Sequence, residues 1–131
     1  MIGDRGARAW RGFTLIELMV VMAIISVLLT IALPKYLHSV AHSREAVLHE
    51  DLRIMRLAID QFYADRGRYP ASVDELVERR YLRSVPVDPV TESAQTWVAV
   101  KPPETVAADG LYDIRSGAPG SALDGSPYVA W

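Results

Sequence analysis

The stretch GFTLIE, from Gly12 to Glu17, decides the fold of this chain. It joins a basic leader, residues 1–12, to an apolar segment, residues 13–33, whose only charged residue is Glu17. The leader carries three arginines and one aspartate. Because the positive flank of a membrane-spanning helix stays on the cytoplasmic side, we expect the leader to lie there.

The apolar segment is long enough to cross a membrane. Its 21 residues extend about 31 Å as a helix, close to the hydrocarbon thickness of a bilayer. The alternative is an ordinary secretory signal, which has a shorter apolar core of about 7–15 residues and a small-residue cleavage site. The nearest such site, at residues 30–32, runs directly into Leu33 and Pro34. We therefore expect residues 13–33 to form a transmembrane helix.

Glu17 raises the question of what satisfies an acid inside this segment. Thirteen of the 21 residues are Leu, Ile, Val or Phe. Each contributes about −0.3 to −0.6 kcal/mol to insertion, and together they outweigh one carboxylate, which costs about 2.5–3.5 kcal/mol at mid-helix. One explanation is a carboxylate near the interface that the positive end of the helix dipole favours. The other is a cationic partner, because acids within membrane spans are usually functional.

A cut in the chain between Gly12 and Phe13 would create such a cation. The new α-amine of Phe13 would have no partner in its own helix, and the Glu17 of a neighbouring subunit would supply one. In a medium of low dielectric this ion pair is strongly favoured over either charge alone. A helix that carries both charges at one end selects an axially staggered neighbour, which predicts assembly into a polymer of fixed register.

The N-terminal sequence resembles the class III signal of type IV pilins and of the pseudopilins of type II secretion. The resemblance lies in GFTLIE at residues 12–17, in LMVVMAII at residues 18–25, and in Pro34, which closes the apolar run. It implies removal of the leader by a prepilin peptidase, N-methylation of Phe13, and a contact between Glu17 and the N-terminal amine of another subunit.

Composition agrees with a small structural protein. The chain has 131 residues and a formal net charge of −2, and without residues 1–12 it has 11 basic and 15 acidic residues. This acidic balance does not favour nucleic-acid binding, which needs a basic patch. The chain has no cysteine, so no disulfide or thiolate metal site holds it together. Many type IV pilins close a C-terminal loop with a disulfide, and within the resemblance its absence favours the pseudopilins.

A second helical pattern follows Pro34. Large apolar residues recur at spacings of three and four, the period of one helix face: Leu48, Leu52, Met55, Ile59 and Phe62. This predicts an amphipathic helix that ends near residue 66, before Gly67. Pro34 removes a backbone hydrogen bond, so we expect a kink or a melted turn there. Either it only curves the helix, or it provides a flexible point for the packing of staggered subunits.

The remainder of the chain predicts a small head. Ser72 and Glu75 form the pattern of a capping box at the start of a short helix. Residues 85–89 contain two prolines and suit a loop. Three segments favour short strands of an antiparallel sheet: residues 96–100, 111–115 and 128–131. We therefore predict an α+β fold. Residues 34–131 contain the amphipathic half of the long helix and a small head with a short helix and an antiparallel sheet, and the helix packs on this head.

The head resembles the major pseudopilin of the type II secretion system. The resemblance lies in the step from Tyr69 to Pro70, in PVDP at residues 86–89, and in GLYDIRSG at residues 110–117. With the N-terminal signal, it covers nearly the whole chain.

The same resemblance implies a calcium site in the C-terminal loop, with Asp113 and Asp124 as the carboxylate ligands of a hard-oxygen shell. Pro119 stands where the family pattern has an acid, which leaves only these two carboxylates. The alternative is that Asp124 and Gly125 form a turn and that Asp113 is a solvated acid at a strand edge.

No motif predicts an enzyme. His38 and His42 are four residues apart, but no third ligand follows at the spacing of zinc sites. The head beyond the long helix has no histidine to act as the base for a serine nucleophile.

The sequence thus predicts a structural subunit, anchored in the bacterial inner membrane by one span, with its head in the periplasm. It polymerises with other pseudopilins into a periplasmic filament that acts in type II secretion. The resemblance implies three further partners: the prepilin peptidase, the inner-membrane secretion assembly platform and the lipid bilayer. The alternatives are a type IV pilus subunit for motility, adhesion or DNA uptake, and a single-span anchored binding module that does not polymerise.

Overall fold

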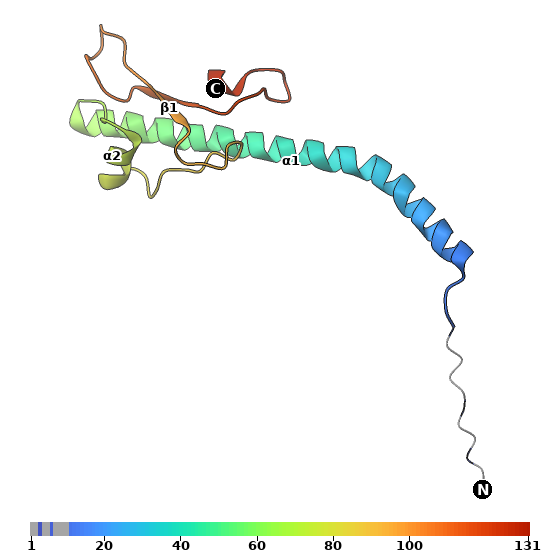
Figure 1. Cartoon of the computed structure of the whole chain (residues 1–131). Coiled ribbons are helices and arrows are strands. Elements are labelled where there is room, and N and C mark those ends of the chain that lie inside the picture. Colours follow the sequence, from blue (N-terminus) through green and yellow to red (C-terminus); the bar gives the residue numbers. More distant parts are fainter. Residues whose placement is uncertain (1–2, 4–5, 7–10) are drawn as a thin grey trace. The chain divides into compact units, whose positions relative to one another are not determined.

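The computed structural model describes Gly3, Gly6 and residues 11–131. The rest of the predicted leader, including two of its arginines and its aspartate, lies outside the described residues. The elements follow in the order α1 (Leu15–Arg66), α2 (Val73–Glu78), β1 (Trp97–Val100), β2 (Asp113–Ser116) and a 3-10 turn, η1 (Tyr128–Ala130) (Figure 1). A long helix, a short helix and a two-stranded sheet confirm the predicted α+β class.

The chain divides into two compact units, residues 1–38 and residues 39–131. The first unit contains the apolar part of α1, where every described side chain is exposed. Pro34 lies inside α1, and the helical conformation continues on both sides of it. The turn around Pro34 is therefore not melted in the single chain, and its role as a flexible point in assembly stays a prediction.

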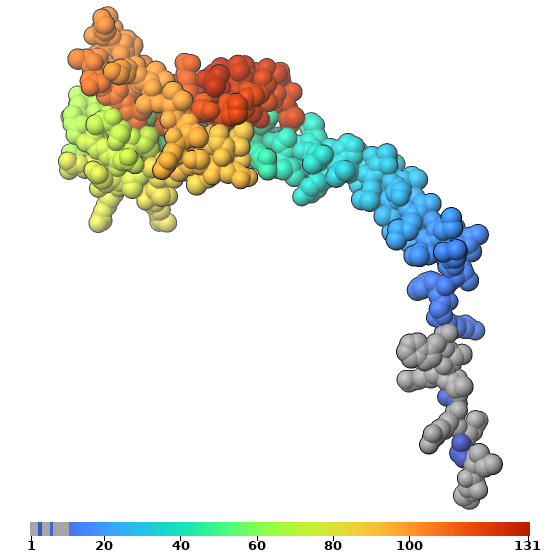
Figure 2. Space-filling model, viewed as in Figure 1, coloured from blue at the N-terminus to red at the C-terminus, as the bar shows by residue number. Residues whose placement is uncertain are grey.

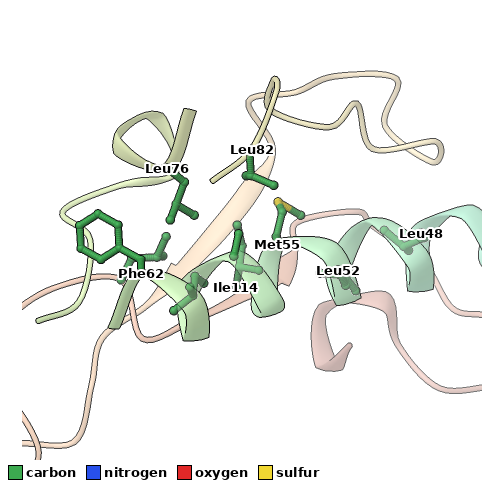
Figure 3. Packing of buried hydrophobic residues seen from close by; sticks show 10 residues of the cluster. Leu48, Leu52, Met55, Phe62, Leu76, Leu82 and Ile114 are labelled. Carbon is green, nitrogen blue, oxygen red and sulfur yellow. The ribbon is translucent and has the colours of Figure 1, made fainter. Parts of the chain in front are cut away.

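The second unit has a hydrophobic core on the amphipathic stripe of α1. All five residues of the predicted stripe are buried, each with at most 1% of its surface exposed. They pack against buried side chains from the rest of the head, including Leu111. Figure 3 shows three of these partners together with the stripe: Leu76, Leu82 and Ile114. Full burial of one such side chain contributes about 1.5–3 kcal/mol, so each residue of the stripe stabilises the head.

The end of α1 is as predicted. Gly67 has a φ of +67°, and its N–H donates to the carbonyl of Tyr63 at 2.8 Å. A residue in this left-handed conformation, which glycine adopts without a Cβ clash, ends many helices.

The start of α2 differs from the predicted capping box. Ser72 is the N-cap residue, but its side chain makes no capping hydrogen bond. The carboxylate of Glu75 instead accepts from the N–H of Ala71 at 2.6 Å and from Arg68 at 2.7 Å. The hydrogen bond from Arg68, followed by that from Ala71, lowers the pKa of Glu75 to about 2. The predicted capping box was wrong, because Arg68 and the N–H of Ala71, which precede the helix, bind the carboxylate of Glu75.

The sheet has two strands. β1 and β2 pair antiparallel, with Trp97 opposite Ser116 and Val100 opposite Asp113. The two predicted strands are confirmed, although β2 begins two residues later than the sequence indicated. The predicted loop, residues 85–89, lies between α2 and β1 and belongs to no helix or strand.

The predicted third strand was wrong. Tyr128–Ala130 forms a 3-10 turn, in which the N–H of Ala130 donates to the carbonyl of Pro127 at 3.0 Å. The physical reason is that Trp131 stacks on His49 of α1. The side chains of this segment therefore pack on the helix, and its backbone closes a 3-10 turn and adds no strand to the sheet.

A buried acid connects the loop after α2 with the end of β2. Asp88 is fully buried, and its carboxylate accepts from the N–H of Val90 and from the hydroxyl of Ser116, both at 2.8 Å. It also accepts from the N–H of Thr91 at 3.3 Å. These hydrogen bonds offset the cost of burying a polar group, which is high when the group has no partner.

Gly117 provides a test of the packing after β2. A Cβ at this position would lie 2.1 Å from the carbonyl oxygen of Thr96, so we expect Gly117→Ala to lower the free energy of unfolding by about 1–3 kcal/mol. Chemical denaturation of the full chain in detergent measures this change. The comparison is Gly120→Ala, where the Cβ meets open space but φ is +92°; it should cost less, about 1 kcal/mol. An equal or smaller loss from Gly117→Ala would contradict this account of the packing.

Candidate functional site at the start of the apolar helix

Thr14 and Glu17 form a capping box at the start of α1. The N–H of Thr14 donates to Oε2 of Glu17 at 3.0 Å, and the N–H of Glu17 donates to Oγ1 of Thr14 at 3.2 Å. The carbonyl of Thr14 accepts the first helical hydrogen bond, from the N–H of Leu18 at 3.2 Å. Thr14 is therefore the N-cap, and two N–H groups that the first turn would leave free have partners.

Sequence reasoning placed Glu17 at the helix start but missed the role of Thr14. The signal was present, because Thr14 precedes Glu17 by three residues and an apolar run follows. The two explanations of Glu17 are thus not exclusive. The acid stabilises the start of its own helix, and it also remains available to a partner.

One carboxylate oxygen of Glu17 is free within the described part of the chain. Only Oε2 accepts a hydrogen bond there, and none of the described ion pairs includes Glu17. A carboxylate has about four acceptor positions on its two oxygens. Oε1 can therefore accept a further donor while Oε2 keeps its bond to Thr14.

An open apolar hollow of about 380 Å³ lies beside this carboxylate. Its lining consists of Phe13, Ile16, Glu17, Val20 and Val21. The Phe13 side chain is 90% exposed. The arrangement places an acid with a free oxygen next to an uncovered apolar surface, which suits a partner that is apolar and carries a cation.

The predicted processing site lies directly before the helix. Gly12 and Phe13 are exposed and belong to neither a helix nor a strand. Accessible backbone outside helices and strands is the usual place of proteolytic cleavage. Cleavage between these two residues, and methylation of the new amine, stay predictions.

The helix that follows meets the physical requirements of a membrane span. A window of 18 residues within α1 has a mean hydropathy of 2.7, and none of it is buried in the structure. By length and composition it is the one helix of the described residues that could cross a membrane.

The two predicted calcium ligands have other partners. Oδ1 of Asp113 accepts from Nε of Arg56 and from the N–H of Ile114, both at 2.8 Å. Oδ1 of Asp124 accepts from the N–H and the hydroxyl of Ser126 at 2.9 and 2.6 Å. Among the described residues, no group of three or more His, Asp or Glu is placed to hold a metal ion. Calcium takes six to eight oxygen ligands, and these two carboxylates supply only part of such a shell; calcium binding stays a prediction from the sequence.

Comparison with known proteins places the chain in a family. The model of the prokaryotic N-terminal methylation motif matches residues 11–33. The fimbrial protein EcpC of Eikenella corrodens is 34% identical over 121 residues, which cover 88% of this chain and 78% of that protein. The type II secretion system core protein G of Escherichia coli is 29% identical over 125 residues, which cover 83% of this chain and 81% of that protein.

The type IV major pilin protein PilA of Myxococcus xanthus is 38% identical over 66 residues, which cover 50% of this chain and 30% of that protein. No solved structure gives a significant match. The motif at the helix start and the similarity over most of the chain lead to one conclusion: the chain belongs to the family of type IV pilins and type II secretion pseudopilins.

Proposed function

We propose that this chain is a structural, non-enzymatic subunit of a pseudopilus, a periplasmic filament that acts in type II protein secretion. The observation that carries the proposal is the half-satisfied carboxylate of Glu17 at the start of an uncovered apolar helix. The similarity to a core protein G over most of both chains supports the secretion role.

Processing prepares the subunit for assembly. A prepilin peptidase removes residues 1–12, and the amine of Phe13 is N-methylated. The match of the methylation motif, which begins at residue 11, includes this bond. The cut removes the arginines of the leader, whose positive charge would otherwise hold this end of the span at the cytoplasmic surface.

The register of the filament comes from Glu17. Its Oε1 accepts the Phe13 amine of a neighbouring subunit, while Oε2 keeps its bond to the N–H of Thr14. The contact therefore does not break the capping box, whose hydrogen bond to a charged group contributes about 1.5–3 kcal/mol. Once apolar helices surround the pair, loss of either partner leaves an uncompensated charge and costs about 3–5 kcal/mol.

Cohesion comes from the apolar half of α1. Its large side chains are mostly 43–77% exposed in the single chain. In the inner membrane, lipid covers them while the subunit is stored, and the head lies in the periplasm. In the filament, the equivalent helices of other subunits cover them, with the assembly platform of the inner membrane supplying the subunits.

A type IV pilus subunit is the second candidate. The observation in its favour is the fimbrial protein from Eikenella corrodens, whose identity to this chain is 34%, against 29% for the Escherichia coli core protein G. Loss of the chain from its host distinguishes the two. A pseudopilus subunit is needed for the release of secreted proteins into the medium, whereas a pilus subunit is needed for surface filaments. Unchanged secretion together with loss of surface filaments would overturn the proposal in favour of the pilus.

Processing gives the first prediction. Gly12→Ala should leave the chain at its full mass, because the bulkier residue blocks the peptidase, while the wild-type chain from the host should lack residues 1–12 and carry one added methyl group. Intact-mass spectrometry measures both. A wild-type chain of unprocessed mass, or a trimmed Gly12→Ala chain, would contradict the assigned site.

Assembly gives the second prediction. Glu17→Ala should insert into the membrane as well as the wild type, because the substitution removes a charge, and should reduce filament yield by at least tenfold, because a cost of 3–5 kcal/mol corresponds to more than that. Glu17→Gln is the matched control, since it keeps the acceptor for Thr14 but not the charge. Electron microscopy and membrane fractionation measure the result. Normal filaments from either variant would rule out a register set by charge.

The capping box gives the third prediction. Thr14→Ala removes the acceptor of the Glu17 N–H, a loss of about 1 kcal/mol, so hydrogen exchange at this amide should become about fivefold faster. Thr14→Ser keeps the hydroxyl and should leave the rate near that of the wild type. NMR of the full chain in detergent micelles measures the exchange. Equal rates in the two variants would mean that the hydroxyl has no such role.

A further inference from the structure

The C-terminal segment of the head, residues 117–131, is attached to α1 by side chains that the sequence did not single out. Glu45 accepts from the N–H of Leu123 at 2.7 Å and from the hydroxyl of Tyr128 at 3.2 Å, both at Oε1. Burial, followed by the hydrogen bond to Glu45, raises the pKa of Tyr128. The phenol therefore stays protonated and donates at neutral pH.

One turn further along α1, an aromatic contact holds the end of the segment. The rings of His49 and Trp131 stack with 3.8 Å between their centres and 15° between their planes. Tyr128 meets Trp131 edge to face at 5.3 Å. We call Glu45, His49, Tyr128 and Trp131 the C-terminal clasp. Figures 1 and 2 show the red C-terminal residues lying along this part of α1.

The loop between these contacts closes on itself. Asp124 accepts two hydrogen bonds from Ser126, and the hydroxyl of Ser126 in turn accepts from Nε1 of Trp131 at 2.9 Å. The N–H of Ala122 donates to the carbonyl of Ser126 at 2.7 Å. Gly125, at φ +87°, provides the left-handed residue of the turn. Oδ1 of Asp124 and the hydroxyl and carbonyl oxygens of Ser126 therefore already belong to a network that ends on the clasp.

The two acids predicted to share an ion are held at different levels of α1. Asp113 is bonded to Arg56, whereas the loop that contains Asp124 is bonded to Glu45. These two helix positions are 11 residues apart in the sequence, about 16 Å along the axis. The two acids therefore have separate attachments to α1, and among the described residues no group of three or more His, Asp or Glu is placed to hold an ion.

We propose that the C-terminal clasp closes this segment in place of a bound calcium ion, so that the head folds and keeps its full stability without calcium. This inference concerns the head alone and does not depend on the filament role. The segment that the family resemblance assigns to a metal is held here by an acid, a histidine and two aromatic residues.

Thermal unfolding of the full chain in detergent micelles tests the proposal, with the near-ultraviolet circular dichroism signal as the readout. Each variant is measured in millimolar calcium and in excess EGTA. The wild type should show the same Tm in both. A rise of several degrees in calcium that Asp124→Asn removes would overturn the proposal, because that variant keeps the acceptor for Ser126 but loses the charge that an ion needs.

Two histidines of α1 give a matched pair of variants. His49→Ala removes the stacking contact and should lower Tm by on the order of 5 °C, equally with and without calcium. His42→Ala is the control, since His42 is exposed and makes no hydrogen bond or aromatic contact among the described residues; its Tm should stay at the wild-type value. An equal Tm for the two variants would overturn the clasp.

Trp131→Phe is a milder change to the clasp, and it tests the proposal if His49→Ala does not fold. Phenylalanine preserves the stacked ring but cannot donate to Ser126. We expect Trp131→Phe to fold, with a Tm below that of the wild type but above that of His49→Ala. Calcium should again leave its Tm unchanged. A Trp131→Phe chain that recovers its Tm when calcium is added would overturn the proposal, because the ion would then be able to close the segment.

Discussion

A carboxylate within an apolar helix must be hydrogen-bonded or paired, and the architecture of the N-terminal unit follows from this constraint. Thr14 satisfies one oxygen of Glu17 and in doing so fixes the first turn of α1. The other oxygen has no partner among the described residues, and Glu17 lines an exposed apolar hollow. The same side chain therefore stabilises the start of its own helix and leaves one oxygen free to accept a hydrogen bond from a second helix. A helix start with an apolar residue in place of Glu17 would meet neither condition.

The chain contains the same four-residue pattern twice, and only one copy forms a capping box. At Thr14 and Glu17, both reciprocal hydrogen bonds are present. At Ser72 and Glu75, the carboxylate turns to Arg68 and to the N–H of Ala71 instead. The difference is the competing donor, because a guanidinium binds a carboxylate more strongly than a neutral N–H does. A local pattern thus predicts where a helix starts more reliably than it predicts which atoms satisfy the cap.

The distinction extends to the whole fold. The buried stripe of α1, its end at Gly67 and the two strands all follow from local periodicity and turn chemistry, and the structure agrees with them to within two residues. The contacts that complete the head join residues far apart in the sequence. Asp88 and Ser116 are separated by 28 positions, and Glu45 and Tyr128 by 83. No spacing rule connects such residues, because their meeting depends on how the sheet and the loops pack on α1. The third strand fails for the same reason, because the local pattern of residues 128–131 does not reveal that Trp131 packs on His49 of the helix.

The two units differ in how much apolar surface they leave uncovered. In the described part of the chain, no buried side-chain nitrogen or oxygen lacks a hydrogen-bond partner, and the head has its own hydrophobic core. The apolar half of α1 has no core of its own and exposes its large side chains. The contacts that subunits need for cohesion are therefore concentrated in the helix, while the head depends mainly on itself. A self-sufficient head can change the way its C-terminal segment is closed, from a metal or a disulfide to a clasp of side chains, without altering the surface on which helices assemble. The methylation motif that identifies the family lies at the start of this exposed helix, at residues 11–33.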